Sequence, residues 1–387
     1  VGAILLLTIC ILLPFYLFYD KKRELQKVSS RFETVLVFFL IIFAQVVSPV
    51  TMNAYSLFSK RIPLEITTPS TVDVSSISTN RGSSEKSNGI ASVPFLEYYS
   101  NDTSSSRTGN PRNFVFIYLE SLERTYFDEQ LFPGLIRHLR RLEEEGLSFS
   151  QISQVANTGW TIAGMVASQC GIPLYTPAAG NSMGGMDVFL PGAYCLGDRL
   201  GDEGYELSYL GGSALSFAGK GKFLLTHGFT DINGKDELSP FLLDQSYMSY
   251  WGLYDDSLYD MAFNSFLDLS GTKEKFGLFL LSLDTHHPKG HPSASCEGIA
   301  YGDGTNSMLN AVACTDQLVG DFVERIRVSR YGKETVVFIV SDHLAMKNTA
   351  SNLLVKGDRK NLFIILDPKL ERHALIEKHG PTSDSAS

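Results

Sequence analysis

FVFIYLES, residues 114–121, is the stretch of this sequence that decides its fold class. Its first six residues are all large and apolar. A short, continuous apolar run of this kind is typical of a strand that is covered on both faces in a parallel sheet. Glu120 follows the run directly, so its carboxylate would lie at the carboxyl edge of that sheet, where open α/β sheets bind their ligands.

Similar apolar runs recur along the chain and alternate with segments of helical character. The further strand candidates are residues 205–210, 276–283, 335–340 and 362–366, and the helix candidates are residues 133–145, 161–170, 195–203, 255–269 and 308–328. This alternation predicts an α/β domain with a doubly wound, mostly parallel sheet and helices on both faces. We expect the domain to occupy residues 113–387.

Two long segments near the N-terminus carry no charged side chain, residues 1–19 and residues 34–58. A bilayer core about 30 Å thick needs about 20 apolar residues in a helix, so both segments are predicted to be transmembrane helices. The alternatives are a signal peptide for the first segment and a buried core helix for the second. Because the chain starts with Val1, further spans are expected to precede it.

The loop between the two predicted spans sets their orientation. Residues 20–33 contain Lys21, Lys22, Arg23, Lys27 and Arg31. Short loops rich in Lys and Arg stay in the cytoplasm, so everything after residue 58 is expected on the other side of the membrane. Residues 59–112, rich in Ser, Thr, Asn and Gly, are predicted to form a flexible extracytoplasmic linker. His373 and His379 are interpreted as solvated side chains of a polar C-terminal tail.

The net charge limits the possible partners of the protein, and the cysteine content indicates its cellular compartment. The chain of 387 residues has a net charge of −9 and no basic stripe, which argues against nucleic acid as a partner. Four cysteines lie in the expected domain, and in an exported domain they suggest two disulfides with three possible connectivities. Pairing of sequence neighbours, Cys170–Cys195 and Cys296–Cys314, is our expectation, and four buried free thiols are the alternative.

Chemically active side chains follow three of the predicted strands. Glu120 follows the first, Asp284-Thr285-His286-His287 follows residues 276–283, and Asp342-His343 comes just after residues 335–340. Since the carboxyl ends of parallel strands meet at one edge of a sheet, these residues are expected to lie close together. Carboxylate and imidazole ligands suit Zn²⁺ or Mn²⁺ better than Ca²⁺. The sequence therefore predicts a metal site there.

A nucleophile for such a site is expected at a turn that opens a helix. Residues 156–165 contain Thr158, Gly159 and Thr161 just before a helical pattern, whose first N–H groups would hold a phosphate. Coordination to a metal would activate a threonine hydroxyl. Spacing does not choose between the two threonines, and either of them alternatively serves only as a helix cap.

Four motifs together resemble the alkaline phosphatase/sulfatase superfamily. They are YLESLERTYFD (118–128), NTGWTIAGMVASQCGIPL (157–174), DTHHP (284–288) and SDHLAM (341–346). Within the superfamily, the similarity is closest to the membrane phosphoglycerol transferases, which include lipoteichoic acid synthases and the phosphoglycerol transferases I of osmoregulated periplasmic glucan synthesis. The resemblance covers roughly residues 112–368 and implies a sulfatase-like fold.

The resemblance also implies roles for single residues. The matches to the family's metal ligands are Glu120, Thr161, Asp342 and His343, with Thr161 also the covalent nucleophile. His286 matches a phosphate-binding histidine, and His287 is a candidate for proton transfer or for capping the turn. Lys220 stands where lipoteichoic acid synthases have an arginine that holds the glycerol phosphate, which keeps the charge but loses the bidentate fork.

Two departures narrow the implied activity. Gly211-Gly212-Ser213 replaces a His-Gly-Asp of the lipoteichoic acid synthases, so the acceptor pocket is expected to differ and a polyglycerolphosphate polymerase is disfavoured. The modified Cys or Ser of the sulfatases, in a C/S-x-P-x-R motif, is absent at residues 161–165.

The function implied by the resemblance is transfer of phosphoglycerol from phosphatidylglycerol to periplasmic glucans, through a covalent intermediate on Thr161, with release of diacylglycerol. The expected cofactor is Mn²⁺, with Zn²⁺ or Mg²⁺ as alternatives, and the expected location is the bacterial inner membrane with a periplasmic catalytic domain. The alternatives are a phosphoethanolamine transferase acting on lipid A or a glycan, a sulfatase or phosphodiesterase, and an inactive glycan-binding relative.

Overall fold

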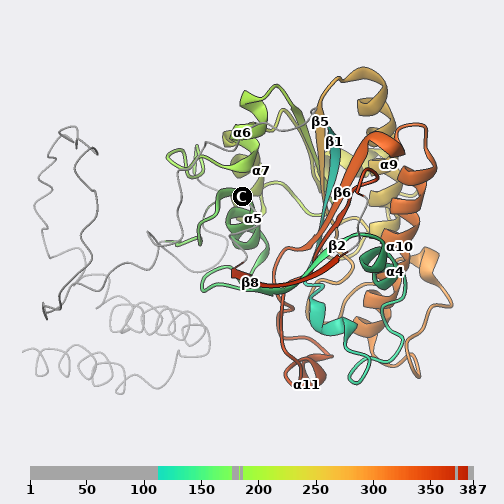
Figure 1. The fold of residues 1–387 in the computed structure, drawn as a ribbon. Coiled ribbons are helices and arrows are strands. Elements are labelled where there is room, and N and C mark those ends of the chain that lie inside the picture. Colours follow the sequence, from blue (N-terminus) through green and yellow to red (C-terminus); the bar gives the residue numbers. More distant parts are fainter. Residues whose placement is uncertain (1–111, 177–182, 184–185, 371–373, 382–387) are drawn as a thin grey trace, which may run out of the picture. The chain divides into compact units, whose positions relative to one another are not determined.

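A single mixed sheet organises the part of the chain that a computed structural model describes, residues 112–176, 183, 186–370 and 374–381. The strand order is β4-β3-β5-β1-β6-β7-β2-β8 (Figure 1). The strands are β1 (Asn113–Leu119), β2 (Leu147–Ser153), β3 (Glu206–Gly211), β4 (Asp231–Asn233), β5 (Phe276–Leu281), β6 (Thr335–Ser341), β7 (Phe363–Leu366) and β8 (Ala374–Pro381).

Helices cover both faces of the sheet (Figure 1). They are α4 (His138–Glu145), α5 (Thr161–Cys170), α6 (Leu196–Asp202), α7 (Lys220–Thr226), α8 (Lys235–Leu238), α9 (Asp255–Thr272), α10 (Ser307–Val328) and α11 (Ser351–Leu354), with short 3₁₀ turns η3 (Arg124–Phe127), η5 (Phe217–Gly219), η6 (Ser239–Phe241), η7 (Ala294–Cys296) and η8 (Gly332–Glu334). Helices α4, α9 and α10 pack on one face, and α5, α6 and α7 pack on the other. The prediction of helices on both faces is therefore confirmed.

The alternation of side chains along β1 explains the two cores. Val115, Ile117 and Leu119 belong to the cluster shared with α4, α9 and α10. Phe116 and Tyr118 belong to the cluster shared with α5 and α7. Successive residues of a strand point to opposite faces, so a strand buried on both faces must be apolar throughout, as this one is.

The three central strands bring the expected site together. Strand β1 lies between β5 and β6 and is parallel to both, with Tyr118 opposite Leu281 on one side and Val340 on the other. The chain therefore leaves all three strands at the same edge of the sheet. The loops that begin at Glu120, Ser282 and Asp342 are neighbours there.

The five predicted strands are confirmed, but one of them runs in an unexpected direction. Residues 363–366 form β7, which is antiparallel to both β6 and β2. A buried apolar run reads alike in either direction, so its polarity is not visible in the sequence. Strands β2, β4 and β8 were not predicted. Residues 374–381, predicted as part of a polar tail, instead pair with β2 as β8. His373 lies outside the described residues, and the solvation of the His379 side chain stays a prediction.

Helix α4 begins later than predicted, at His138 rather than at residue 133. The carboxylate of Asp316 on α10 accepts hydrogen bonds from the backbone N–H groups of Arg137, His138 and Leu139, at 2.8–2.9 Å. A carboxylate at this position satisfies free N–H groups and stabilises a helix start. Because the cap comes from a distant helix, no local pattern indicates where α4 begins.

Helix α5 lies unusually close to the end of β6. An added Cβ at Gly164 would lie 1.8 Å from the backbone oxygen of Asp342, so only glycine allows this approach. The phenol of Tyr118 on β1 and the hydroxyl of Ser168 on α5 share a buried hydrogen bond of 2.8 Å. These contacts hold the first residue of α5, Thr161, at the carboxyl edge of the sheet.

Both expected disulfides are present, Cys170–Cys195 and Cys296–Cys314. The first joins the C-terminal end of α5 to the start of α6, and the second joins η7 to α10. Within the described residues, no helix is both long and apolar enough to cross a membrane. The predicted spans 1–19 and 34–58, the loop 20–33 and nearly all of the linker 59–112 lie outside those residues.

Candidate active site

Three of the predicted ligands form a buried cluster at the carboxyl edge of the sheet. Glu120, Asp342 and His343 are each 1% exposed. One potential ligand atom from each lies within 4.8 Å of the other two. His343 Nε2 is 3.4 Å from Glu120 Oε1 and 3.3 Å from Asp342 Oδ2. Two carboxylates and an imidazole at these distances form a set of donors that suits a divalent cation.

Ser121 links the two carboxylates and was not predicted to take part. Its hydroxyl donates to Glu120 Oε1 at 2.7 Å, and its backbone N–H donates to Asp342 Oδ1 at 2.8 Å. The residue has a φ of 54°, a left-handed conformation that is uncommon outside glycine. Such local strain is typical of functional sites, where surrounding contacts hold the backbone in place.

The charges of the cluster are strongly coupled. Burial opposes ionisation of Glu120, but the charge and hydrogen bond of His343 prevail and lower its pKa. Burial and the neighbouring charge of Glu120 raise the pKa of Asp342 well above its usual range. Burial disfavours the charged form of His343, yet Asp342 and Glu120 raise its pKa to about 10. Asp342 and His343 therefore both favour their protonated forms, and these protons offset the negative charge of the cluster when no cation is bound.

Two observations indicate that a metal cation fits the cluster. Asp342 Oδ2 is buried and has no hydrogen-bond partner among the described residues, which is unusual for a buried carboxylate oxygen. The Nδ1 of His343 lies 2.8 Å from the backbone oxygen of Leu344, so it carries the proton in the neutral ring and leaves Nε2 free as a ligand. Both features are expected of a metal site.

The structure distinguishes the two candidate threonines. The hydroxyl of Thr161 donates to Glu120 Oε2 at 3.1 Å and faces the cluster. Thr158 is 1% exposed, and its hydroxyl donates to the backbone oxygen of Val155 at 2.7 Å. Neither threonine caps α5, whose N-cap is Trp160. Of the two, Thr161 alone therefore combines a reachable hydroxyl with the acidic cluster.

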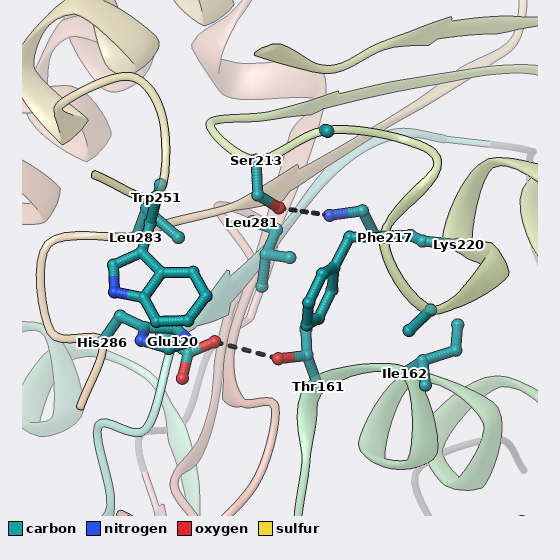
Figure 2. Close-up of a pocket in the computed structure, with 12 residues that line it drawn as sticks. Glu120, Thr161, Ile162, Ser213, Phe217, Lys220, Trp251, Leu281, Leu283 and His286 are labelled. Carbon is teal, nitrogen blue, oxygen red and sulfur yellow. Dashed lines mark hydrogen bonds between the residues drawn. The ribbon is translucent and has the colours of Figure 1, made fainter. Parts of the chain in front are cut away.

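Lys220 and His286 share a pocket with Thr161 and Glu120 (Figure 2). The pocket encloses about 550 Å³ of space with its open mouth included. Lys220 is 2% exposed, and its Nζ donates to Ser213 Oγ at 2.5 Å. Burial lowers the pKa of Lys220 to about 8, against the opposing effect of Glu120 and Asp342. The ammonium group of Lys220 thus places a positive charge across the pocket from the hydroxyl of Thr161.

The loop after β5 carries two adjacent histidine rings. The rings of His286 and His287 stack with centroids 4.7 Å apart, and the ring of Trp251 lies 4.0 Å from that of His286. Burial, together with the charge of His286, lowers the pKa of His287. His286 lines the pocket, whereas His287 lies beside it.

Two buried carboxylates hold this loop in place through hydrogen bonds. Asp255 is 0% exposed and accepts the backbone N–H groups of Leu283 and Asp284. Asp284 in turn accepts the hydroxyl and the N–H of Ser293. Burial raises the pKa of both carboxyls, that of Asp255 to about 7. Asp284 therefore positions the histidine loop and does not belong to the ligand cluster.

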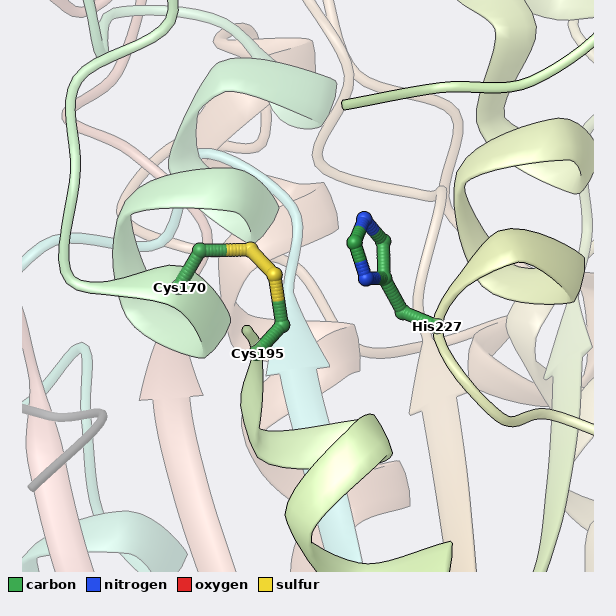
Figure 3. A group of neighbouring side chains, drawn as sticks. All are labelled: Cys170, Cys195 and His227. Carbon is green, nitrogen blue, oxygen red and sulfur yellow. A yellow bond between two sulfur atoms is a disulfide. The ribbon is translucent and has the colours of Figure 1, made fainter. Parts of the chain in front are cut away.

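A second cluster has the composition of a metal site but not its chemistry. Cys170, Cys195 and His227 lie close together (Figure 3). The two sulfurs are bonded to each other, and a disulfide does not provide the thiolates that bind a metal. The nitrogens of His227 are also engaged, Nδ1 with Asp198 Oδ2 at 2.7 Å and Nε2 with the oxygen of Phe189 at 3.0 Å. This cluster joins α5, α6 and α7.

Comparison with known proteins identifies the family. A family model described as Sulfatase matches residues 112–384, which is most of the chain. The chain belongs to the sulfatase family. The predicted sulfatase-like α/β fold is thereby confirmed.

The curated relatives of this sulfatase-family chain include proteins named phosphoglycerol transferase I. Phosphoglycerol transferase I from Xanthomonas euvesicatoria pv. vesicatoria is 46% identical over 279 residues, which are 71% of this chain and 40% of that protein. Phosphoglycerol transferase I from Salmonella choleraesuis is 45% identical over 282 residues, 72% of this chain and 37% of that protein. The chain therefore spans only about two fifths of the length of these relatives.

Solved structures agree on the fold of the sulfatase-family domain. The lipoteichoic acid synthase LtaP from Listeria monocytogenes matches with a TM-score of 0.56 at 19% identity, covering 70% of this chain and 69% of that one. A protein in the alkaline phosphatase superfamily from Vibrio parahaemolyticus matches with a TM-score of 0.56 at 20% identity, covering 71% of this chain and 64% of that one. At these identities the likeness concerns the fold alone.

Metal binding to the sulfatase-family cluster should strengthen as the pH rises. A cation must displace the protons of His343 and Asp342, and both groups hold them tightly because their pKa values are raised. We expect the apparent affinity of chelator-treated protein for Mn²⁺ to rise at least about tenfold between about pH 6 and about pH 8. Isothermal titration calorimetry in buffers of different ionisation enthalpy would measure both the affinity and the released protons.

Asp342→Asn should remove most of this binding, whereas Asp358→Asn, at a side chain that is 72% exposed, should leave it unchanged. An affinity that is independent of pH, or the same in Asp342→Asn as in the parent protein, would contradict a metal site at this cluster.

Proposed function

We propose that this chain carries the catalytic domain of a metal-dependent phosphoglycerol transferase, which moves phosphoglycerol from phosphatidylglycerol to a periplasmic glucan. The observation that carries the proposal is the position of the Thr161 hydroxyl, 3.1 Å from Glu120 in a pocket that also holds Lys220 and His286. The identity of 46% to a phosphoglycerol transferase I supports the choice of the transferred group.

The phosphoryl group of the donor would bind between Thr161 and the two basic residues of the pocket. Lys220 is charged below a pH of about 8 and would neutralise one phosphoryl oxygen. His286 would place its Nε2 beside another from the opposite wall, because its Nδ1 faces the backbone oxygen of His287. The first N–H groups of α5 are free of intrahelical partners and add a partial positive charge beside Thr161.

In the first displacement, Thr161 Oγ attacks the phosphorus and the bond from phosphorus to the diacylglycerol oxygen breaks. Phosphoglycerol remains on Thr161, and the proton of the Thr161 hydroxyl passes by way of His287 to the diacylglycerol oxygen, which leaves as the alcohol. A divalent cation held by Glu120, Asp342, His343 and Thr161 would lower the pKa of the threonine hydroxyl and offset the negative charge of the phosphoryl group. We propose Mn²⁺ as the native ion, with Zn²⁺ and Mg²⁺ as alternatives.

In the second displacement, a sugar hydroxyl of the glucan attacks the same phosphorus. The bond from phosphorus to Thr161 breaks, and the proton of the sugar hydroxyl passes by way of His287 to Thr161 Oγ, which restores the starting state. A lowered pKa at His287 favours the neutral ring, which can accept the proton of an attacking hydroxyl.

The proposed setting is the outer face of the bacterial inner membrane. The two uncharged segments, residues 1–19 and 34–58, would anchor the chain, and the basic loop 20–33 would remain in the cytoplasm. An anchored enzyme meets a lipid donor at a high effective concentration, because both are confined to the same membrane.

The donor can be identified by trapping the intermediate. The full chain in detergent, loaded with Mn²⁺ and incubated with phosphatidylglycerol without acceptor, should give a peptide containing Thr161 that is heavier by one glycerophosphoryl group. Mass spectrometry of the digested protein would locate the adduct, because transfer to water is expected to be slow compared with transfer from the lipid.

An adduct with phosphatidylethanolamine instead would identify a phosphoethanolamine transferase. Release of free glycerol phosphate with neither adduct nor glucan product would identify a hydrolase. Absence of any reaction in metal-loaded protein would contradict an enzymatic role for the domain.

A further inference from the structure

One wall of the pocket is aromatic and only partly buried. The indole of Trp251 lies on the side of His286, and the ring of Phe217 lies above Thr161 (Figure 2). The centroids of these two rings are 6.4 Å apart and their planes are nearly perpendicular. Tyr250, 86% exposed, packs edge-on against Trp251 at 5.2 Å. Together Trp251, Phe217 and Tyr250 form what we call the aromatic wall.

The backbone holds Trp251 in this position. A tight hairpin contains it, in which the N–H of Ser249 donates to the oxygen of Gly252 at 2.8 Å. Gly252 has a φ of 150°, and an added Cβ there would lie 1.9 Å from the oxygen of Gly212. The hairpin is therefore fixed to the loop after β3, whose Ser213 contacts Lys220. An aromatic group that is rigidly held but not buried is available to a ligand.

The chemistry of the wall does not suit the donor headgroup. An aromatic face is electron-rich and repels an anion, so these rings contribute nothing to binding a phosphoryl group. The phosphoryl group has its partners in Lys220 and His286. A pyranose ring, in contrast, has apolar faces of C–H groups that stack on aromatic rings, and its hydroxyls remain free at the edges.

The charge around the wall favours a neutral partner over a membrane surface. Residues 236–256 contain no Lys or Arg, and apart from the buried Asp255 their acidic side chains are Asp236, Glu237, Asp244 and Asp256. An anionic phospholipid surface attracts basic segments and repels acidic ones. A neutral glycan experiences no such repulsion.

We propose that Trp251, with Phe217 and Tyr250, is a subsite for pyranose rings of the acceptor glycan. The indole stacks on the sugar whose hydroxyl faces Thr161, and Tyr250 extends the surface toward the next sugar of the chain. This assignment rests on the proposed function for the identity of the reaction, but binding of the sugar does not require turnover.

Binding can be measured directly because the chain contains two tryptophans, Trp160 and Trp251. Titration of the full chain in detergent with a neutral gluco-oligosaccharide should change its tryptophan fluorescence with saturation. Trp251→Ala should weaken binding by about tenfold or more, measured for this variant by isothermal titration calorimetry, and Trp251→Phe should recover part of it. Phe241→Ala is the matched control, since Phe241 is 76% exposed on the same segment but does not line the pocket, and it should bind as the parent protein does.

An alternative is that Trp251 only positions His286 and does not bind sugar. Trapping the intermediate distinguishes the two roles. If the wall binds the acceptor, the loss of oligosaccharide affinity and the rise in acceptor KM in Trp251→Ala exceed the loss in the rate of adduct formation on Thr161 by about tenfold. Changes of similar size in the oligosaccharide affinity, the acceptor KM and the rate of adduct formation would overturn the proposal. So would unchanged oligosaccharide binding in both Trp251→Ala and Trp251→Phe, or a loss of binding to phosphatidylglycerol vesicles without a loss of sugar binding.

The proposed function fails separately, if the parent protein forms no glycerophosphate adduct. Saturable sugar binding that depends on Trp251 would then still support the subsite, because its measurement does not require the donor.

Discussion

Thr161→Ala is expected to abolish the covalent intermediate and to reduce phosphoglycerol transfer by at least about 10³-fold. The hydroxyl of Thr161 faces Glu120 at the edge of the acidic cluster and donates to its Oε2 at 3.1 Å. Transfer of radiolabelled glycerophosphate to a glucan, with mass spectrometry of the active-site peptide, would measure both effects. Thr161→Ser should retain part of the activity because it keeps the hydroxyl.

Thr158→Ala is the matched control for this experiment. It removes a hydroxyl three residues away that donates to Val155 and lies outside the pocket. We expect a loss of about 1 kcal/mol in the free energy of unfolding and little change in transfer. Full activity in Thr161→Ala, or a glycerophosphate adduct on another residue, would exclude Thr161 as the nucleophile.

Gly164→Ala is expected to have the second largest effect, although this residue makes no contact with a substrate. The new methyl group would lie 1.8 Å from the backbone oxygen of Asp342, so α5 or the end of β6 must move. Overpacking of this kind destabilises a protein by about 1–3 kcal/mol or more. A displacement of about 1 Å between nucleophile and ligands can reduce the rate about 10²-fold. Thermal unfolding and the rate of adduct formation would measure the two effects.

Gly201→Ala provides the comparison, because Gly201 also lies in a helix, α6, with nothing within 4 Å of an added Cβ. Alanine is the better helix former by about 1 kcal/mol, so this variant should be as stable as the parent protein or more stable. If Gly164→Ala behaved in the same way, the close approach of α5 to Asp342 would not be needed for the site.

The strands that carry the site could be predicted from local sequence, and so could the residues that follow them. The run of residues 114–119 is apolar at every position because both faces of β1 are buried. The expected strand ends then placed Glu120, His286 and Asp342-His343 at one edge, and the structure brings these residues together. The prediction succeeds here because a strand that is covered on both faces must be apolar at every position, and such a run is visible in its own residues.

The supporting residues of the site could not be predicted, because their partners are distant in the sequence. Ser121 bonds to Asp342 across 221 residues. Asp316 caps α4 from 177–179 residues away, so the helix predicted from residue 133 begins at His138. A serine or an aspartate is common in any sequence, and only its three-dimensional neighbours reveal its role. Trp251 likewise gives no local signal of its place beside His286.

The sequence by itself determined the α/β class, the five strands rich in apolar residues and the residues at the three strand ends, and it favoured the cysteine pairing that the structure has. These features depend on local periodicity or on short separations along the chain. Only the tertiary structure decided between Thr158 and Thr161, the direction of β7, the role of residues 374–381 as a strand and the aromatic wall of the pocket. Each of these depends on which segment packs against which, and that packing is a property of the whole domain and not of any one segment.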